Sequence, residues 1–436
     1  MMSSMNPPAA RPTPPGRLAA PDEIALITRL IRSADAVTKS EIGERSRIGR
    51  NVVSERIKEA VRLGLVEPSG TRRSTGGRAP ETYRFRAERG VVLAACLGAA
   101  TMTCAVTDLA GRLIESTRIE WSVTEGPDAT MARIERAFRE LLGCAPDVAL
   151  WGIGIGLPSP VDHDSGRPVD PPIMSGWHGF DVQAWFVERF GVGTWVDNDV
   201  NCMAIGHRAT SGTSEDFIYV KVGTGIGAGL FSNGRLHRGV AGAAGDIGHV
   251  RTSDRTDAVC RCGSIGCLEA VAAGWALARD ATVAAIEGRS AYLRDVLQRN
   301  GQIVPADVGR GSVRTEPVCT ELAARSATLV GHVLAVLVNF YNPSRIVVGG
   351  GVVDSAQLYV PAVERALRER ANALATRGLE VTVGDPQQRE GVVGCAHLVL
   401  DALLSGPFIA AWAPHAGPAG VRAIVHRKVQ YAPDAT

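Results

Sequence analysis

The sequence predicts a small winged helix-turn-helix at the N-terminal end, followed by a larger α/β body. Residues 22–66 carry three short stretches of helical apolar spacing, and a turn-rich basic segment follows them. From Val91 onward, apolar strand-like runs alternate with glycine loops and helical stretches, which is typical of an α/β fold. The length of 436 residues is too great for one ordinary core and fits two or three domains.

The composition is that of a soluble globular protein, with 45% hydrophobic and 21% charged residues. The apolar runs are short or interrupted, so we expect no bilayer span and no membrane partner. Residues 1–19 are rich in Pro and small residues and lack the apolar core of a signal peptide. We expect them to form a disordered leader, and we expect the protein to be cytoplasmic.

The net charge of +2 hides an asymmetry along the chain. Residues 22–89 hold fifteen Lys and Arg against ten Asp and Glu, so this end is basic. A local basic excess favours a module that faces nucleic acid, although arginine-rich surfaces also occur without that role.

Three helices are expected in this basic region. Apolar residues at helical spacing predict the first over residues 22–33. Ser40 is a candidate N-cap for a short second helix. The third covers Gly49–Leu63, because Gly64 suits the end of a helix and Leu65 begins a strand-like run.

A third helix of this kind can enter the major groove, and the basic hairpin after it can lie along phosphates or in the minor groove. The alternative is a three-helix protein-interaction module with a solvated charged face. The candidate DNA-binding residues are Arg50, Asn51, Ser54, Lys58, Arg72, Arg73 and Arg78.

In the body, residues 151–162 form an apolar strand that runs into a Gly/Pro turn. Residues 195–201 form a strand that ends in Asp197, Asn198 and Asp199. Carboxylates in this position can accept a proton from a substrate hydroxyl, but Asp and Asn are also favoured helix caps, and spacing does not separate these alternatives. Residues 220–230 form a strand with a Gly-Thr-Gly turn, whose N–H groups can cradle a phosphate.

The clearest local signal is a cluster of potential metal ligands. His249 is followed by Cys260, Cys262 and Cys267 in a C-x-C-x4-C pattern. One imidazole and three thiolates are the ligand set of a closed structural zinc site. A chance group of buried thiols beside an unrelated His is the alternative.

These segments, in this order, resemble the ROK family of bacterial sugar kinases and sugar-responsive repressors. The resemblance covers about residues 20–405, and the N-terminal module is similar to the repressor branch. It implies an actin-like ATPase fold with two α/β lobes around a cleft. The sugar ligands that it implies are Asn198, Asp199, Asp246, His249 and Glu269, with Asp199 in the place of the catalytic base. The phosphate-loop remnant would be Gly223, Thr224 and Gly225.

The chain departs from the family at the first phosphate loop. The family pattern Asp-x-Gly-Gly-Thr aligns with Cys96–Ala100, where the Asp, one Gly and the Thr are missing. Kinases work by positioning phosphates and neutralising their charge, so these losses argue against phosphoryl transfer and against bound ATP and magnesium. The family's Glu before Ile-Gly-His is Asp246 here, which shortens its reach by one methylene.

The sequence therefore predicts a sugar-responsive DNA-binding regulator, most simply a repressor of carbohydrate metabolism genes. Its body would be a degenerate kinase that holds a structural zinc ion. The alternatives are a sugar kinase that carries a DNA-binding domain and a DNA-binding scaffold without a ligand. The partners would be operator DNA, a sugar or sugar-phosphate effector, and further copies in a homodimer or homotetramer. The expected division is a leader 1–19, a winged helix 20–87, a small lobe 88–198, a large lobe 199–390, a returning helix 391–405, and a tail 406–436 of unknown role.

Overall fold

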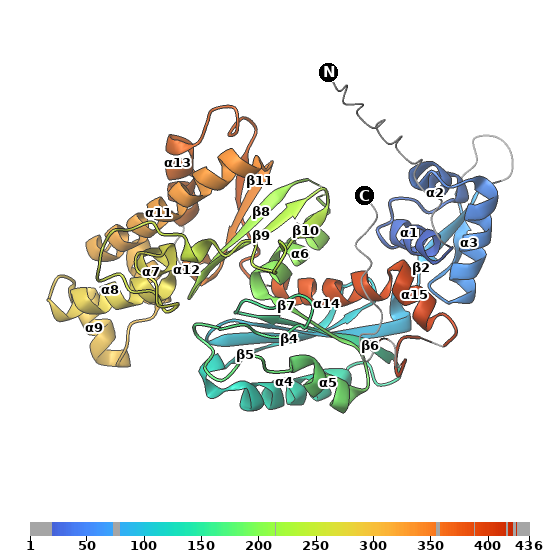
Figure 1. The fold of residues 1–436 in the computed structure, drawn as a ribbon, viewed down its shortest axis with the longest axis horizontal. Coiled ribbons are helices and arrows are strands. Elements are labelled where there is room, and N and C mark those ends of the chain that lie inside the picture. Colours follow the sequence, from blue (N-terminus) through green and yellow to red (C-terminus); the bar gives the residue numbers. More distant parts are fainter. Residues whose placement is uncertain are drawn as a thin grey trace, which may run out of the picture. The chain divides into compact units, whose positions relative to one another are not determined.

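A computed structural model of the chain describes residues 20–72, 79–213, 215–354, 358–387, 389–415, 417–421 and 424. The chain divides into two compact units (Figure 1). The first lies within Met1–Ala87 and Ala402–Gly417, and the second lies within Glu88–Asp401 and Pro418–His426.

The first unit is a winged helix-turn-helix. Its elements are α1 (Ala20–Arg32), α2 (Lys39–Ser46), α3 (Arg50–Arg62), β1 (Val66–Thr71) and β2 (Glu81–Phe85), with β1 and β2 paired as an antiparallel hairpin. The expected cap at Ser40 is wrong, because Thr38 is the N-cap of α2. The Thr38 hydroxyl accepts from the Glu41 N–H at 3.3 Å, and the Glu41 carboxylate accepts from the Thr38 N–H at 3.0 Å. This reciprocal pair satisfies two free donors at the start of the helix.

The core of the first unit forms where α1 and α3 face each other. Ile24, Ile27 and Ile31 of α1 are buried, as are Val53 and Ile57 of α3. Burying one such side chain contributes about 1.5–3 kcal/mol, so this small contact supplies much of the unit's stability. A largely buried ion pair between Glu23 and Arg56, at 2.9 Å, joins the same two helices.

A helix from the far end of the sequence also belongs to this unit. Helix α15 (Gly406–Trp412) packs against α1, and a side chain at Gly406 would overlap with Asp22. Trp412 is fully buried, and its indole N–H donates to the Leu403 carbonyl at 2.8 Å. The start of the tail, for which the sequence indicated no role, therefore completes the core of the winged helix.

The second unit contains two five-stranded sheets of the same topology. The first sheet has the order β5 (Leu113–Glu120), β4 (Thr101–Asp108), β3 (Gly90–Leu97), β6 (Ala149–Leu157) and β7 (Thr194–Asn198). The second has the order β10 (Arg235–His237), β9 (Ile226–Ser232), β8 (Phe217–Val222), β11 (Arg345–Gly349) and β12 (Glu380–Val383). Each is a three-stranded antiparallel meander extended by two parallel strands, so one architectural unit occurs twice.

Helices cover both faces of the first sheet (Figure 1). The apolar sides of α4 (Pro127–Leu142) and α5 (Val182–Phe190) pack on one face. Helix α14 (Arg389–Leu403) lies on the other, over the glycines of β6. A side chain at Gly154 would overlap with the Cys395 carbonyl, and one at Gly152 would lie 2.6 Å from Val399. The alternating glycines of β6 therefore allow the helix backbone to rest directly on the strand.

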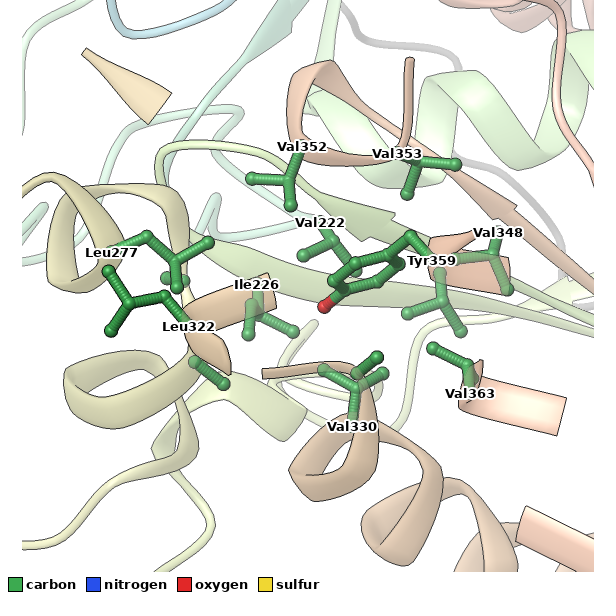
Figure 2. Packing of buried hydrophobic residues seen from close by; sticks show 14 of the residues in the cluster. Val222, Ile226, Leu277, Leu322, Val330, Val348, Val352, Val353, Tyr359 and Val363 are labelled. Carbon is green, nitrogen blue, oxygen red and sulfur yellow. The ribbon is translucent and has the colours of Figure 1, made fainter. Parts of the chain in front are cut away.

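The remaining helices of the second unit lie around the second sheet. They are α6 (Asp199–Ser211), α7 (Leu268–Ala272), α8 (Gly274–Ile286), α9 (Ala291–Asn300), α10 (Pro305–Val313), α11 (Pro317–Tyr341), α12 (Gly351–Asp354) and α13 (Tyr359–Arg370). Figure 2 shows part of this core, with the Tyr359 ring among Val222, Val330 and Val348. The Tyr359 hydroxyl lies 2.7 Å from the hydroxyl of Ser326, so the polar end of the buried ring is hydrogen bonded.

By length and composition alone, α11 is apolar enough to cross a bilayer, and the sequence had not led us to expect such a helix. In its most apolar window, 56% of the residues are buried within the protein. Its buried residues pack in the core of the second sheet, so its hydrophobicity is explained by that contact.

Candidate ligand cleft and metal centre

A cavity of about 530 Å³ opens in the second unit, a size suited to a small ligand. Both sheets contribute to it. Its lining residues include Cys96–Ala100, Ser159, Asn198, Asp199, Lys221, Gly223–Gly225, Asp246, His249, Glu269, Val304–Ala306, Gly350 and Gly351. All five residues expected to bind a sugar, and the three expected at the phosphate-loop remnant, thus line one cavity. Val304–Ala306 also line it; they belong to residues 287–316, for which the sequence indicated no role.

The side chain of Asn198 caps helix α6. Its side-chain Oδ1 accepts from the backbone N–H of Val200 at 2.9 Å and of Asn201 at 3.3 Å. Its amide nitrogen donates to the Ser159 carbonyl at 2.9 Å. The capping alternative is therefore correct for its oxygen, and the second N–H of the amide is what the side chain has left to offer a ligand.

Asp199 begins α6 and is buried, and its carboxylate forms an ion pair with Lys221. The adjacent Asp197 has a separate cation, because Arg238 binds it with two N–H groups at 2.7 and 2.9 Å. Burial alone lowers the pKa of Lys221, but the charge and the hydrogen bond of Asp199 raise it above its ordinary value. We did not identify Lys221 from the sequence; its signal is a single charge in the apolar strand that precedes the Gly-Thr-Gly turn.

Glu269 lies against the turn at Gly223–Gly225. Its Oε2 accepts from the Ile226 N–H at 3.1 Å, and a Cβ at Gly225 would lie 2.6 Å from the same oxygen. An alanine at residue 225 would therefore have to displace the Glu269 carboxylate. The turn is also held from the other side, because Gly274 at the start of α8 donates to the Gly223 carbonyl at 2.8 Å.

Four potential metal ligands converge beside the cleft. One donor atom from each of His249, Cys260, Cys262 and Cys267 lies within 4.8 Å of all the others. The Cys260 sulfur is 3.6 Å from His249 Nδ1, and the Cys262 and Cys267 sulfurs are 3.9 Å apart. Burial raises the pKa of Cys260 to about 12. At Cys262 burial acts in the same direction, but hydrogen bonds from Ser264 and the neighbouring thiols bring the pKa to about 7. The cluster could hold a metal ion.

His249 connects this cluster to the cleft. Its Nδ1 faces the cysteines, whereas its Nε2 lies 3.7 Å from Asp246 Oδ1, and both residues line the cavity. One imidazole can therefore present one nitrogen to a metal and the other to a ligand.

The candidate DNA-contacting residues lie on the first unit. Arg50, Asn51 and Lys58 of α3 are exposed, and Ser54 is half-buried. Arg72, where the loop between β1 and β2 begins, is exposed and forms an ion pair with Glu41 of α2. Arg73 and Arg78 lie outside the described residues.

Two matched sheets around a ligand cleft, with a winged helix-turn-helix attached, define a two-lobed protein of the actin-like ATPase fold that carries a potential nucleic-acid-binding module. More narrowly, the chain belongs to the ROK family, whose model, described as "ROK family", matches residues 92–402.

Relatives of two kinds resemble the chain. A xylose repressor of Caldicellulosiruptor bescii is 25% identical and covers 88% of this chain and 96% of its own. The DNA-binding transcriptional dual regulator NagC of Escherichia coli is 27% identical, over 88% and 93%. A glucokinase of Halalkalibacterium halodurans is 28% identical, over 70% of this chain and 93% of its own.

Among solved structures, a ROK-family transcriptional regulator described as a homologue of the Escherichia coli MLC protein has a TM-score of 0.73 at 20% identity, covering 88% of this chain and 98% of its own. A ROK-family glucokinase from Streptomyces griseus, in complex with glucose and AMPPNP, has a TM-score of 0.62 at 25% identity, over 71% and 99%.

Proposed function

We propose that this chain is a sugar-responsive, DNA-binding transcriptional regulator, a repressor of carbohydrate metabolism genes whose kinase-like body senses the ligand. The observation that carries the proposal is the extent of similarity. The two regulators match 88% of the chain and the glucokinase 70%. Because only 34 residues follow the family match at 402, the longer alignments must extend well into the winged helix.

We assign DNA contact to α3 and the hairpin. Arg50, Asn51 and Ser54 would meet base edges, and Lys58 and Arg72 would meet phosphates together with Arg73 and Arg78. Arg72 forms an ion pair with Glu41, so a DNA phosphate would have to compete with that carboxylate for the arginine. The DNA-binding domain of the proposal is residues 20–87, supported by α15, and a homodimer or homotetramer would place two such helices on a palindromic operator.

We assign sugar binding to Asp199, Asp246, His249 and Glu269, with the free N–H of Asn198. Carboxylates and an imidazole around a cavity of this size suit a ligand rich in hydroxyl groups. The first phosphate loop, Cys96–Ala100, has no carboxylate or hydroxyl for magnesium or phosphate, so we expect neither ATP binding nor turnover.

We assign a structural zinc ion to His249, Cys260, Cys262 and Cys267. Tetrahedral zinc with bonds of about 2.3 Å to sulfur and 2.0–2.1 Å to nitrogen places ligand atoms about 3.8 Å and 3.6 Å apart. The sulfur–sulfur separation of 3.9 Å and the sulfur–nitrogen separation of 3.6 Å fit this geometry. The ion would fix the His249 ring at the edge of the sugar site. The protein would act in the cytoplasm.

A fluorescence anisotropy titration tests the proposal. DNA sequences selected from a random pool by the full-length protein are titrated with and without D-xylose, D-glucose or N-acetyl-D-glucosamine. Specific DNA binding that changes with one sugar is expected. Absence of any sequence-specific binding would refute the regulator assignment.

The second candidate is a sugar kinase that carries a DNA-binding domain, favoured by the intact Asp199 and the Gly223–Gly225 turn. It is distinguished by a coupled ADP-release assay with the same sugars. Turnover at an ordinary kinase rate of about 1–100 per second would favour this alternative over the sensor.

A further inference from the structure

The Lys221–Asp199 ion pair lies in the cavity to which we assign sugar binding. Lys221 is the penultimate residue of β8, and its neighbours Val220 and Val222 are fully buried on the opposite face. The lysine points into the cavity, with its side chain 20% exposed and that of Asp199 only 4% exposed. Its stem lies against the turn, because a Cβ at Gly223 would be 3.2 Å from Lys221 Cε.

An ammonium group in this position changes the chemistry of the carboxylate. A general base has to accept a proton from the reacting hydroxyl. The Asp199 carboxylate already accepts a hydrogen bond from the Lys221 ammonium and is its counter-ion, so a proton transferred to Asp199 would leave that ammonium without a charged partner. The carboxylate nevertheless keeps lone pairs that can accept a hydrogen bond.

The ammonium also adds donors to a site rich in acceptors. Asp199, Asp246 and Glu269 present carboxylates to the cavity, and the oxygen of Asn198 is taken by the helix. A lysine has three N–H donors, and the bond to Asp199 uses one. The remaining two can reach a ligand oxygen beside the carboxylate, so lysine and aspartate together match a hydroxyl that both donates and accepts.

We propose that Lys221 is a ligand-positioning residue that holds Asp199 as a permanent hydrogen-bond acceptor, supplies a donor beside it, and withholds it from proton transfer. The ligand group that this pair recognises is an uncharged hydroxyl of a sugar. The inference rests on the proposed function, because it takes the cleft to be a sugar site. If Lys221 acts in this way, the expected lack of kinase activity has a second cause, which is independent of the loop at Cys96–Ala100.

The ion pair itself is tested without a ligand by a double-mutant cycle of thermal unfolding, with Lys221→Met, Asp199→Asn and both together. Removing one partner leaves the other buried and unpaired, so each single variant should lose about 3–8 °C in Tm. The double variant should lose less than the two single losses added together. The matched control is Arg136→Met with Glu140→Gln, an exposed pair on α4, whose losses should be small and additive.

The positioning role is tested by calorimetric titration with D-glucose, D-xylose or N-acetyl-D-glucosamine and with the corresponding monodeoxy sugars. Wild type should prefer one parent sugar to one of its deoxy analogues by at least about tenfold. In Lys221→Met this ratio should fall below about threefold, and Lys221→Arg should restore most of it. A lysine with only a structural role would change Tm and leave the ratio unchanged.

The outcomes separate the two claims. If no sugar binds wild type, the proposed sugar site fails and this inference fails with it. If wild type binds a sugar and Lys221→Met retains the full ratio, Lys221 is not a positioning residue, while the sensor proposal stands. Additive losses in the Tm cycle would show that the ion pair is absent in solution.

Discussion

The first hairpin turn of each sheet lines the same cavity, but the two turns differ in chemistry. Leu97–Ala100 joins β3 to β4, and Gly223–Gly225 joins β8 to β9, so they occupy equivalent places in the repeated topology. The first is anchored to its own sheet: Gly98 donates to Thr101 at 2.7 Å, and Ala99 and Ala100 accept from backbone N–H groups after β5. The second is also closed by its own backbone, since the Gly223 N–H donates to the Gly225 carbonyl at 2.9 Å. In addition it is anchored to Glu269, through the Ile226 N–H, and to the start of α8.

The two turns therefore make different contacts at the cavity. Residues 97–100 of the first turn carry no polar side chain, and their backbone hydrogen bonds close the hairpin and join it to the chain after β5. The second is built around a ligand-facing carboxylate whose helix begins directly after Cys267. A chain that kept its fold but lost phosphoryl transfer would change in this way, on one side of the cleft. If the two sides of the cleft differ in this way, changes on the two sides should have unequal effects.

The largest expected effect concerns the proposed zinc ion. It would hold His249 at the edge of the cavity that Gly223–Gly225 also line. Cys262→Ser should lower zinc affinity by at least about 100-fold, because it removes a direct ligand. Metal analysis should give about one zinc per chain in wild type and almost none in the variant. Hydrogen exchange should rise over residues 245–270 and stay unchanged at 97–101.

Cys144→Ser, at an exposed cysteine outside the cluster, is the matched control and should keep its zinc. Equal, negligible zinc in wild type and both variants would show that the cluster does not bind zinc.

The next effect is the unequal response to the two ligands of a kinase. A bound sugar should change the affinity for selected DNA by about 5–150-fold, which is the usual range of coupling free energies. ATP with magnesium should change it less than twofold. Asp199→Ala should abolish the sugar response, as measured by fluorescence anisotropy. If ATP changed DNA affinity as much as the sugar does, the cavity would not be specific for the sugar, and the proposed difference between its two sides would be wrong.

A matched pair of glycine variants compares the turns directly. A Cβ at Gly225 would lie 2.6 Å from the Glu269 carboxylate, whereas one at Gly98 would lie 3.3 Å from the Thr101 carbonyl. Gly225→Ala should therefore displace Glu269 and weaken sugar binding about tenfold, by an amount typical of a disturbed buried polar group. Gly98→Ala should leave sugar affinity within twofold. Calorimetric titration measures both, and equal losses would show that the turns do not differ.

The sequence predicted most of the fold but fewer of the contacts that build the site. Helical spacing was sufficient for α1 and α3, because their apolar stripes are local. It misplaced the cap of α2, since Thr38 and Ser40 are equally suitable residues and the reciprocal bond of Glu41 decides between them. The packing of α15 on α1 joins opposite ends of the chain, and no local pattern indicates it.

The same limit applies to the cleft. The family resemblance indicated many of the residues that line it, but the sequence did not decide between the capping and the ligand role of Asn198, and it did not predict that Lys221 pairs with Asp199. Both facts depend on how neighbouring strands and helices meet. The glycines of β6 are similar: their alternation acquires a meaning only when α14, more than 200 residues later, lies on them.

The smallest expected effect is a partial repair of the first turn by Cys96→Asp, which restores one carboxylate of the family pattern. Cys96 and Lys221 line the same cavity, and residue 96 is near enough to act electrostatically on that lysine. A new carboxylate there would therefore meet an ammonium group that already serves Asp199, and would be partly neutralised. Gly98, Ala99 and Ala100 would still offer no hydroxyl to a phosphate. Affinity for AMPPNP with magnesium should rise only about 2–5-fold, which is about 0.4–1 kcal/mol. Thermal shift against nucleotide concentration measures the gain, and the coupled ADP-release assay should remain at background with every sugar.

Cys104→Asp is not a suitable control, because that thiol is fully buried in the core of the sheet. Cys144→Asp is a suitable control, because Cys144 is exposed. A single substitution that brought turnover within the ordinary range of sugar kinases would mean that the first turn alone separates this chain from an enzyme, and that Lys221 does not restrain Asp199.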